Sequence, residues 1–313
     1  MLKLLVMLLA AAAFSANAET LLVKRIDGSA INVEIQRPAS SKPVPIVLAI
    51  DGSLCTPEGL SEWVGWLRSQ RNGEKPYSVL VVAKPGPTTP APDRDGGYSV
   101  GPHFACSDEF KRHYTLDQRV LDHLQALAYL RKNAPWWDGR LLLWGFSDGA
   151  HIGARVATYA PETKAGVLIG MGGGTSMAEE LERMMCATEK PAETCVKNFR
   201  AQADEIRRNP IPSKSWLGDA NTYAAWSSRL DGVETNVLAF ARFPILLVHG
   251  AKDGSVPVAA ARALASALKA PSGTVQYIEV PGMGHGLGSG LTPEESKMLR
   301  GRTLDWLLEH GLQ

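Results

Sequence analysis

The feature that most constrains the fold is a series of short apolar runs that alternate with helical patterns. Unbroken runs of Val, Ile and Leu are typical of strands covered on both faces, and helices between such strands imply right-handed parallel crossovers. The pattern therefore predicts an α/β chain with a mostly parallel sheet. The runs are 46–50, 78–83, 140–144, 166–170, 244–248 and 274–280.

Two earlier runs predict that the sheet begins with an antiparallel hairpin. The β-rich stretches 20–26 and 30–37 are separated by Asp27-Gly28-Ser29, a turn signal. Together with the six runs above, they give eight expected strands.

Several helix starts are legible from capping residues. Thr115 with Gln118, and Thr292 with Glu295, have the spacing of a capping box. Thr56 followed by a proline also predicts a helix start, because proline is favoured in the first turn.

Residues 1–18 have the pattern of a signal peptide: Lys3, an apolar run over 4–14, and a small-residue cleavage site ending at Ala18. The run is too short to span a bilayer comfortably, although an uncleaved anchor is the alternative. We expect a periplasmic or secreted chain with no stable membrane insertion after cleavage.

The charge balance excludes nucleic acid as a partner. The chain has 33 Lys and Arg against 32 Asp and Glu, and no run of basic residues could neutralise phosphates.

Export would place the four cysteines in an oxidising compartment, where an even number favours disulfides. Three pairings are possible. We favour Cys186 with Cys195, which are close in sequence, and Cys55 with Cys106, which lie in loops expected at one edge of the sheet. Unpaired buried thiols are the alternative. The cysteine spacings fit no zinc or haem motif, so no metal site is expected.

A long helix-patterned segment, residues 175–242, lies between two expected strands. It is too long for a simple crossover. We interpret it as a helical cap inserted into a single domain over residues 19–313.

The clearest chemical motif is Gly145-Phe146-Ser147-Asp148-Gly149. It follows an expected strand and opens an expected helix, so the chain must turn sharply at the serine. Such a turn lifts the serine side chain off the sheet edge and requires small flanking residues. The motif predicts that Ser147 is a nucleophile, although a turn serine without catalytic function is the simpler alternative.

A serine hydroxyl needs a nearby base, and that base needs an orienting carboxylate. His285 stands in a glycine-rich loop after the run that ends at residue 280, and Asp253 follows the run that ends at residue 248. Both positions are carboxyl ends of strands, where open parallel sheets bind ligands. The alternative for Asp253 is a carboxylate that only stabilises the start of the next helix.

In the order Ser147, Asp253, His285, the chain resembles the α/β-hydrolases. The resemblance implies an eight-stranded fold with a cap after the sixth strand, and it assigns Ser147 as nucleophile, His285 as general base and Asp253 as its partner. It also implies an oxyanion hole made by the backbone N–H of Asp148 and a second N–H in the loop after residue 50.

The second donor is open between Ser53 and Leu54. Many family members have His-Gly at the start of this loop, whereas this chain has Asp51-Gly52, so the support of the loop must differ.

The sequence thus predicts an exported serine hydrolase that cleaves a carboxylic ester or related acyl bond in a small-molecule substrate, without a cofactor. A serine peptidase or amidase on the same fold is one alternative. A catalytically inactive binding protein with the hydrolase fold is another.

Overall fold

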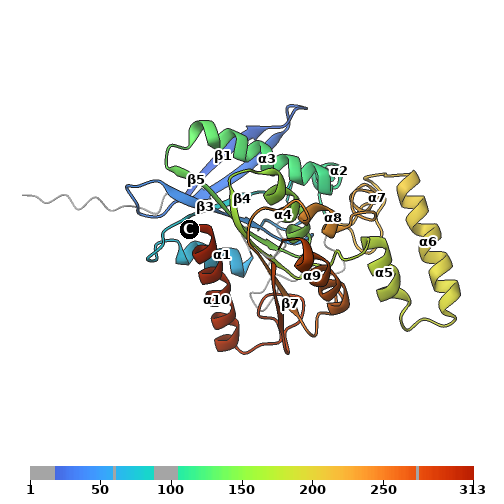
Figure 1. The fold of residues 1–313 in the computed structure, drawn as a ribbon. Helices are drawn as coiled ribbons and strands as arrows, with labels where there is room; N and C mark the ends of the chain where they lie inside the picture. The colour runs from blue at the N-terminus through green and yellow to red at the C-terminus, as the bar shows by residue number, and fades with distance from the viewer. Residues whose placement is uncertain (1–17, 59–60, 88–104, 273–274) are drawn as a thin grey trace, which may run out of the picture.

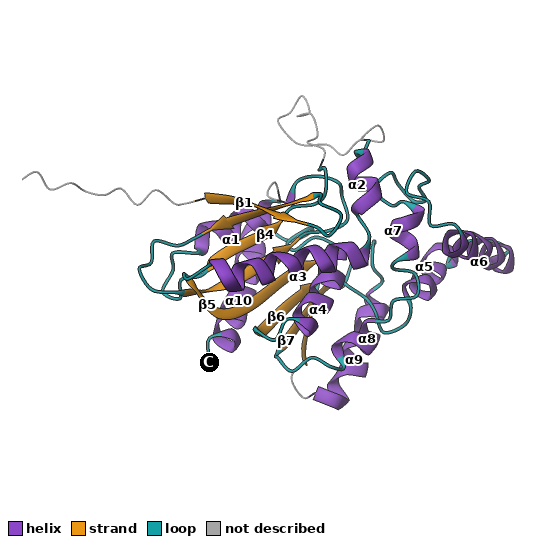
Figure 2. Cartoon of the chain, turned by 90° about the horizontal axis from the view of Figure 1, so that it is seen from above, coloured by secondary structure: helices purple, strands orange, loops and turns teal. Residues whose placement is uncertain are grey.

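A central sheet organises the protein (Figures 1 and 2). The computed structural model describes residues 18–58, 61–87, 105–272 and 275–313, so residues 1–17 of the expected signal peptide lie outside the described residues. The sheet has eight strands in the order β1-β2-β4-β3-β5-β6-β7-β8. The strands are β1 Ala18–Lys24, β2 Ala30–Gln36, β3 Val44–Ile50, β4 Ser78–Val82, β5 Trp137–Phe146, β6 Thr163–Ile169, β7 Ile245–Gly250 and β8 Val275–Val280.

Strand directions confirm the fold class predicted from the sequence. The first two strands form an antiparallel pair, and β2 also runs antiparallel to β4. Every pairing from β4 through β3 to β8 is parallel. All seven residues of β3 are buried, as expected for a central strand covered on both faces.

Helices cover both faces of the sheet. Buried residues of α1 and α10 pack into one hydrophobic cluster, and those of α3, α4 and α9 pack into the cluster on the opposite face. Figure 2 shows α3 and α4 on one side of the strands and α1 and α10 behind them. The helices are α1 Glu62–Gln70, α2 Asp108–His113, α3 Leu116–Asn133, α4 Asp148–Tyr159, α5 Met177–Cys186, α6 Ala192–Arg208, α7 Tyr223–Ser227, α8 Glu234–Leu238, α9 Val258–Ser272 and α10 Pro293–Gly311. In the described part of the chain, none of these helices combines the length and the apolar character needed to cross a bilayer.

Two of the three expected helix starts occur, and one was wrong. Thr115 and Thr292 cap α3 and α10, each accepting a hydrogen bond from a backbone N–H three residues on. The helix expected after Thr56 begins only at Glu62. Segment 51–58 is held as a loop instead, because Glu58 is buried in an ion pair with Arg119 at 3.2 Å.

Residues 175–242, called here the insertion, leave the sheet after β6 and return at β7. In Figure 1, α5 and α6 stand at one side, well away from the strands. The insertion has a small apolar core of its own, which includes Phe199, Ile206 and Tyr223. A disulfide between Cys186 and Cys195 joins the end of α5 to the first turn of α6.

Candidate active site

Ser147 lies at a strained turn between β5 and α4. Its backbone has φ 53° and ψ −124°, a region that residues with side chains rarely occupy. The flanking glycines are sterically required. A Cβ at Gly145 would lie 2.6 Å from the carbonyl oxygen of Gly149, and a Cβ at Gly149 would lie 2.2 Å from that of Ile50. This close packing of strand, turn and helix leaves the Ser147 side chain at the wall of a cavity.

The structure brings the three expected side chains together. His285 Nε2 lies 2.9 Å from Ser147 Oγ, and His285 Nδ1 lies 2.8 Å from Asp253 Oδ2. A carboxylate only accepts hydrogen bonds, so Nδ1 carries the proton and a neutral ring has its Nε2 lone pair towards the serine. Asp253 follows β7 and His285 follows β8, so adjacent strand ends position both groups.

Asp253 is an ionised and firmly held carboxylate. Its side chain is fully buried. Burial alone would raise its pKa, but the hydrogen bonds from His285 and from the amides of Val256 and Ser255 outweigh burial and hold the pKa below its ordinary value. Those two amides donate to Oδ1 at 2.9 and 2.8 Å. Asp253 thus caps the following turn and orients His285 at the same time.

A cavity of about 630 Å³ opens over Ser147 and His285. One side is formed by the loop after β3, and the other by α5 and later parts of the insertion. Its walls are mainly apolar. The apolar side chains in the wall are Leu54, Phe146, Met177, Leu181, Met184, Leu217, Trp226, Val256 and Pro257. The site therefore suits a small molecule with a substantial apolar part.

Known proteins similar to this chain include esterases and peptidases. Residues 199–311, less than half of the chain, match the prolyl oligopeptidase family. No curated protein matches the chain. Among solved structures, a Pyrococcus furiosus esterase is 17% identical, with a TM-score of 0.57 and 93% of each chain covered. A cold-adapted esterase from an Arctic intertidal metagenomic library is 15% identical, with a TM-score of 0.56 and coverage of 94% and 92%.

A third similar structure, the Pyrococcus horikoshii acylaminoacyl peptidase, is 14% identical, with a TM-score of 0.62. The match covers 94% of this chain and 41% of the acylaminoacyl peptidase chain. These structural similarities agree with the strand order described above. The chain has the α/β-hydrolase fold. The family match and the esterase and peptidase neighbours support a serine hydrolase.

In this α/β-hydrolase fold, the loop after β3 approaches the serine closely. A Cβ at Gly52 would lie 3.4 Å from Ser147 Cβ. Ser53, Leu54 and Asp148 all line the cavity. Asp51 stands where many family members have histidine. Its carboxylate accepts a hydrogen bond from the backbone N–H of Gly52, in the same loop, at 2.8 Å.

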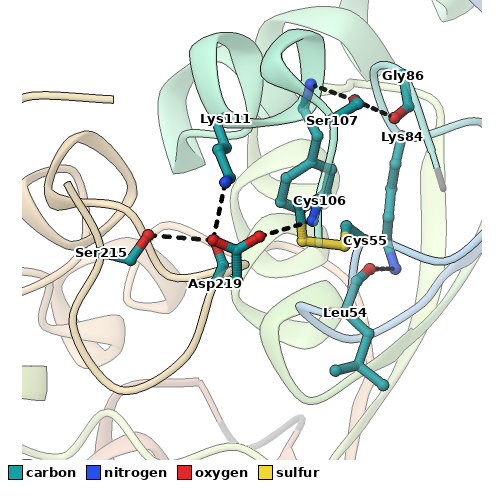
Figure 3. The surroundings of a disulfide bond; sticks show 10 residues. Leu54, Cys55, Lys84, Gly86, Cys106, Ser107, Lys111, Ser215 and Asp219 are labelled. Atoms are coloured by element: carbon teal, nitrogen blue, oxygen red, sulfur yellow. Dashed lines mark hydrogen bonds and ion pairs between the residues drawn. A yellow bond between two sulfur atoms is a disulfide. The ribbon is translucent and has the colours of Figure 1, made fainter. Parts of the chain in front are cut away.

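Side chains that are distant in sequence clamp this loop (Figure 3). Cys55, next to Leu54, forms a disulfide with Cys106. Lys84, only 1% exposed, donates to the Leu54 carbonyl at 2.7 Å, and burial lowers its pKa. The Cys106 amide in turn donates to Asp219 of the insertion at 2.6 Å. The loop is therefore tied both to the main domain and to the insertion.

Sequence reasoning did not single out Lys84, Tyr114 or Arg229, although all three contact the surroundings of the site. Lys84 gave some signal, because it closely follows the apolar run 78–83. Arg229 gave none, because the charges of the insertion are nearly balanced and its partner is distant in sequence. Within the described residues, no group of three or more His, Cys, Asp or Glu side chains is arranged to hold a metal ion.

Proposed function

We propose that this chain is an exported serine hydrolase that cleaves carboxylic esters of small molecules through an acyl-enzyme. Ser147 is the nucleophile, His285 the general base and Asp253 the group that orients His285. The insertion acts as a cap over the cavity. The observation that carries the proposal is the continuous hydrogen-bonded series from Ser147 Oγ through His285 to Asp253 at a strained turn.

In the first half of the reaction, His285 Nε2 accepts the proton of Ser147 while Oγ attacks the ester carbonyl. The carbonyl oxygen becomes an oxyanion, which the N–H of Asp148 and that of Ser53 or Leu54 stabilise. His285 then gives its proton to the departing alcohol. In the second half, His285 takes a proton from water while the hydroxyl attacks the acyl-enzyme carbonyl. His285 then returns that proton to Ser147 Oγ as the bond between Oγ and the acyl carbon breaks, which releases the acid and restores the enzyme.

A panel of p-nitrophenyl esters of increasing acyl length tests this proposal, with wild type measured beside Ser147→Ala. We expect hydrolysis by wild type and a loss in kcat of about 10⁴-fold or more in the variant. Hydrolysis of equal rate by both proteins would refute the mechanism. No hydrolysis of any ester by folded wild type would favour a binding protein with the hydrolase fold.

Cleavage of peptide or amide bonds is a second candidate, and the match to the prolyl oligopeptidase family favours it. The same triad would carry out both reactions. Matched p-nitroanilides and p-nitrophenyl esters with the same acyl group separate the two. A kcat/KM for the anilide equal to or above that for the ester would make the chain a peptidase or amidase.

The proposal of export rests on residues 1–18 and on the two disulfides. Because β1 begins at Ala18, cleavage after this residue leaves a chain that starts within the first strand. The intact mass of protein recovered from a secreting host should correspond to a chain beginning at Glu19 with all four cysteines oxidised. A chain that retains residue 1 would contradict cleavage after Ala18, and four free thiols would contradict export.

A further inference from the structure

Beside the nucleophile lies a buried ion pair that the proposed mechanism does not use. Asp148 follows Ser147 directly, and its side chain is only 7% exposed. Arg229 of the insertion donates from Nε and Nη2 to its two carboxylate oxygens at 2.7 and 2.8 Å. Such a two-point contact fixes both position and orientation.

Tyr114 completes the cluster. Its hydroxyl donates to Asp148 at 2.8 Å and lies 3.4 Å from the carbonyl oxygen of Gly52 in the loop after β3. Arg229 is itself anchored, because Nη1 donates to the Ala225 carbonyl of α7 at 2.7 Å. The cluster therefore joins the nucleophile turn, the opposite loop and the insertion.

The charge of Asp148 needs compensation. Burial alone would raise its pKa, but Arg229, followed by the hydrogen bond from Tyr114, holds the pKa well below the ordinary value, so the group is an anion. Its own backbone N–H is a proposed oxyanion donor. An uncompensated carboxylate on the same residue would repel the negative charge that develops on the substrate.

We propose that Arg229 is a positioning residue through which the insertion neutralises Asp148 and holds the oxyanion site. This rests on the proposed function, because it assumes that Asp148 donates to an oxyanion. Arg229 lines the cavity, but its hydrogen bonds go to Asp148, Ala225 and Ser228 and not to Ser147 or His285. Its effect passes through Asp148, so neutralising Asp148 should make Arg229 largely dispensable for the chemical step.

Four variants test the proposal in steady-state ester hydrolysis: Arg229→Met, Asp148→Asn, the double variant, and Arg207→Met as control. Arg207 is another insertion arginine with two carboxylate partners, Asp231 and Asp204, away from the cavity. We expect Arg229→Met to lower kcat by about 10²-fold with less than threefold change in KM. Adding Asp148→Asn to Arg229→Met should raise kcat at least tenfold above that of Arg229→Met alone. The control should stay within twofold of wild type.

A pH profile provides a readout that a merely structural role would not change. Without Arg229, burial raises the pKa of Asp148, so acidic pH protonates the carboxylate and removes the repulsion. The ratio of kcat for Arg229→Met to kcat for wild type should therefore rise as pH falls. Tyr114, His151 and Lys84 also interact electrostatically with Asp148. These three groups remain in the double variant, so the ratio of its kcat to that of wild type should not change with pH.

A double variant as slow as Arg229→Met, or an Arg229→Met variant as fast as wild type, would overturn the proposal. If Arg229→Met does not fold, the proposal still requires the double variant to fold and to hydrolyse the ester; an unfolded double variant overturns it. Ser147→Ala separates the two levels of inference. If Ser147→Ala keeps full activity, the proposed function fails; if only the rescue is absent, the role of Arg229 alone fails.

Discussion

On one side of Ser147, Asp253 and His285 stand on loops that directly follow neighbouring strands, and the Asp253 carboxylate is held by amides only two and three residues further on. On the other side, the loop carrying Ser53 and Leu54 depends on partners from remote parts of the chain. Its clamps are Lys84, 30 residues from Leu54, and Cys106, 51 residues from Cys55. Local contacts build the acid–base side, whereas long-range contacts build the oxyanion side.

This difference leads to different expectations for mutation. A change on the acid–base side removes a group that acts directly on the proton, so activity should collapse. A change on the oxyanion side leaves the backbone donors present but less well placed, so activity should fall by degrees.

The largest effect is expected on the acid–base side, from Asp253→Asn. An amide can present its N–H to His285 Nδ1 and so favour the wrong tautomer, which should lower kcat by about 10⁴-fold with little change in KM. Asp231→Asn, which alters an exposed partner of Arg207, is the matched control and should keep activity within twofold. A loss of less than tenfold in Asp253→Asn would show that His285 does not depend on this carboxylate.

The two disulfides allow the same kind of substitution to be compared at the oxyanion loop and within the insertion. Replacing Cys55 and Cys106 together by serine should lower kcat about tenfold, because the oxyanion loop loses a clamp. Replacing Cys186 and Cys195 in the same way should change kcat less than twofold, because that bridge lies within the insertion. Equal losses of kcat in both double variants would contradict a specific role for the first bridge.

The same two variants should differ in stability. A bridge that closes a 51-residue separation removes more unfolded-chain entropy than one that closes 9 residues. The loop-entropy relation gives about 4 kcal/mol for the first bridge and about 2.6 kcal/mol for the second. Denaturant unfolding of the oxidised proteins measures both values, and a reversed order would indicate that strain or residual structure dominates.

A smaller effect is expected from Lys84→Met, which keeps the length of the side chain but cannot donate to the Leu54 carbonyl. We expect kcat to fall about fivefold, a fraction of the cost of a lost oxyanion donor. Lys164→Met, at the exposed position of β6, is the control and should leave kcat unchanged. Unchanged kcat in folded Lys84→Met would mean that the loop keeps its position without the hydrogen bond from Lys84.

The smallest effect is expected from Leu54→Ala. The side chain is half exposed and lines the cavity, but the proposed donors are backbone groups that the substitution leaves in place. The kcat for a short acyl ester should change less than twofold, while KM for long acyl chains rises. A tenfold fall in kcat would show that the loop contributes to catalysis through the Leu54 side chain and not only through its backbone donors.

The same contrast separates what could be predicted from the sequence and what could not. The eight apolar or β-rich runs correspond to the eight strands. Burial on both faces gives central strands such as β3 an unbroken apolar run, whereas the partly exposed strands β1 and β2 were found from β-rich residues on either side of a turn. The motif around Ser147 and the loops of Asp253 and His285 were also readable, since each side chain follows the end of a strand and the fold brings those ends together.

The oxyanion side was not readable in the same way. The expected helix start at Thr56 failed because Glu58, Leu54 and Cys55 are held by residues far along the chain. Arg229 lies 81 residues from Asp148, and no local pattern marks such a pair. Spacing predicts where a strand delivers a side chain, but it does not predict which distant side chain will secure a loop.

The most direct test of the central claim is covalent labelling of the folded protein with a fluorophosphonate, followed by mass spectrometry of its peptides. The account predicts a single adduct on Ser147, formed at least a hundredfold more slowly in His285→Ala, because the serine then lacks its base. An adduct on another residue, or an unlabelled Ser147 in folded wild-type protein, would contradict it.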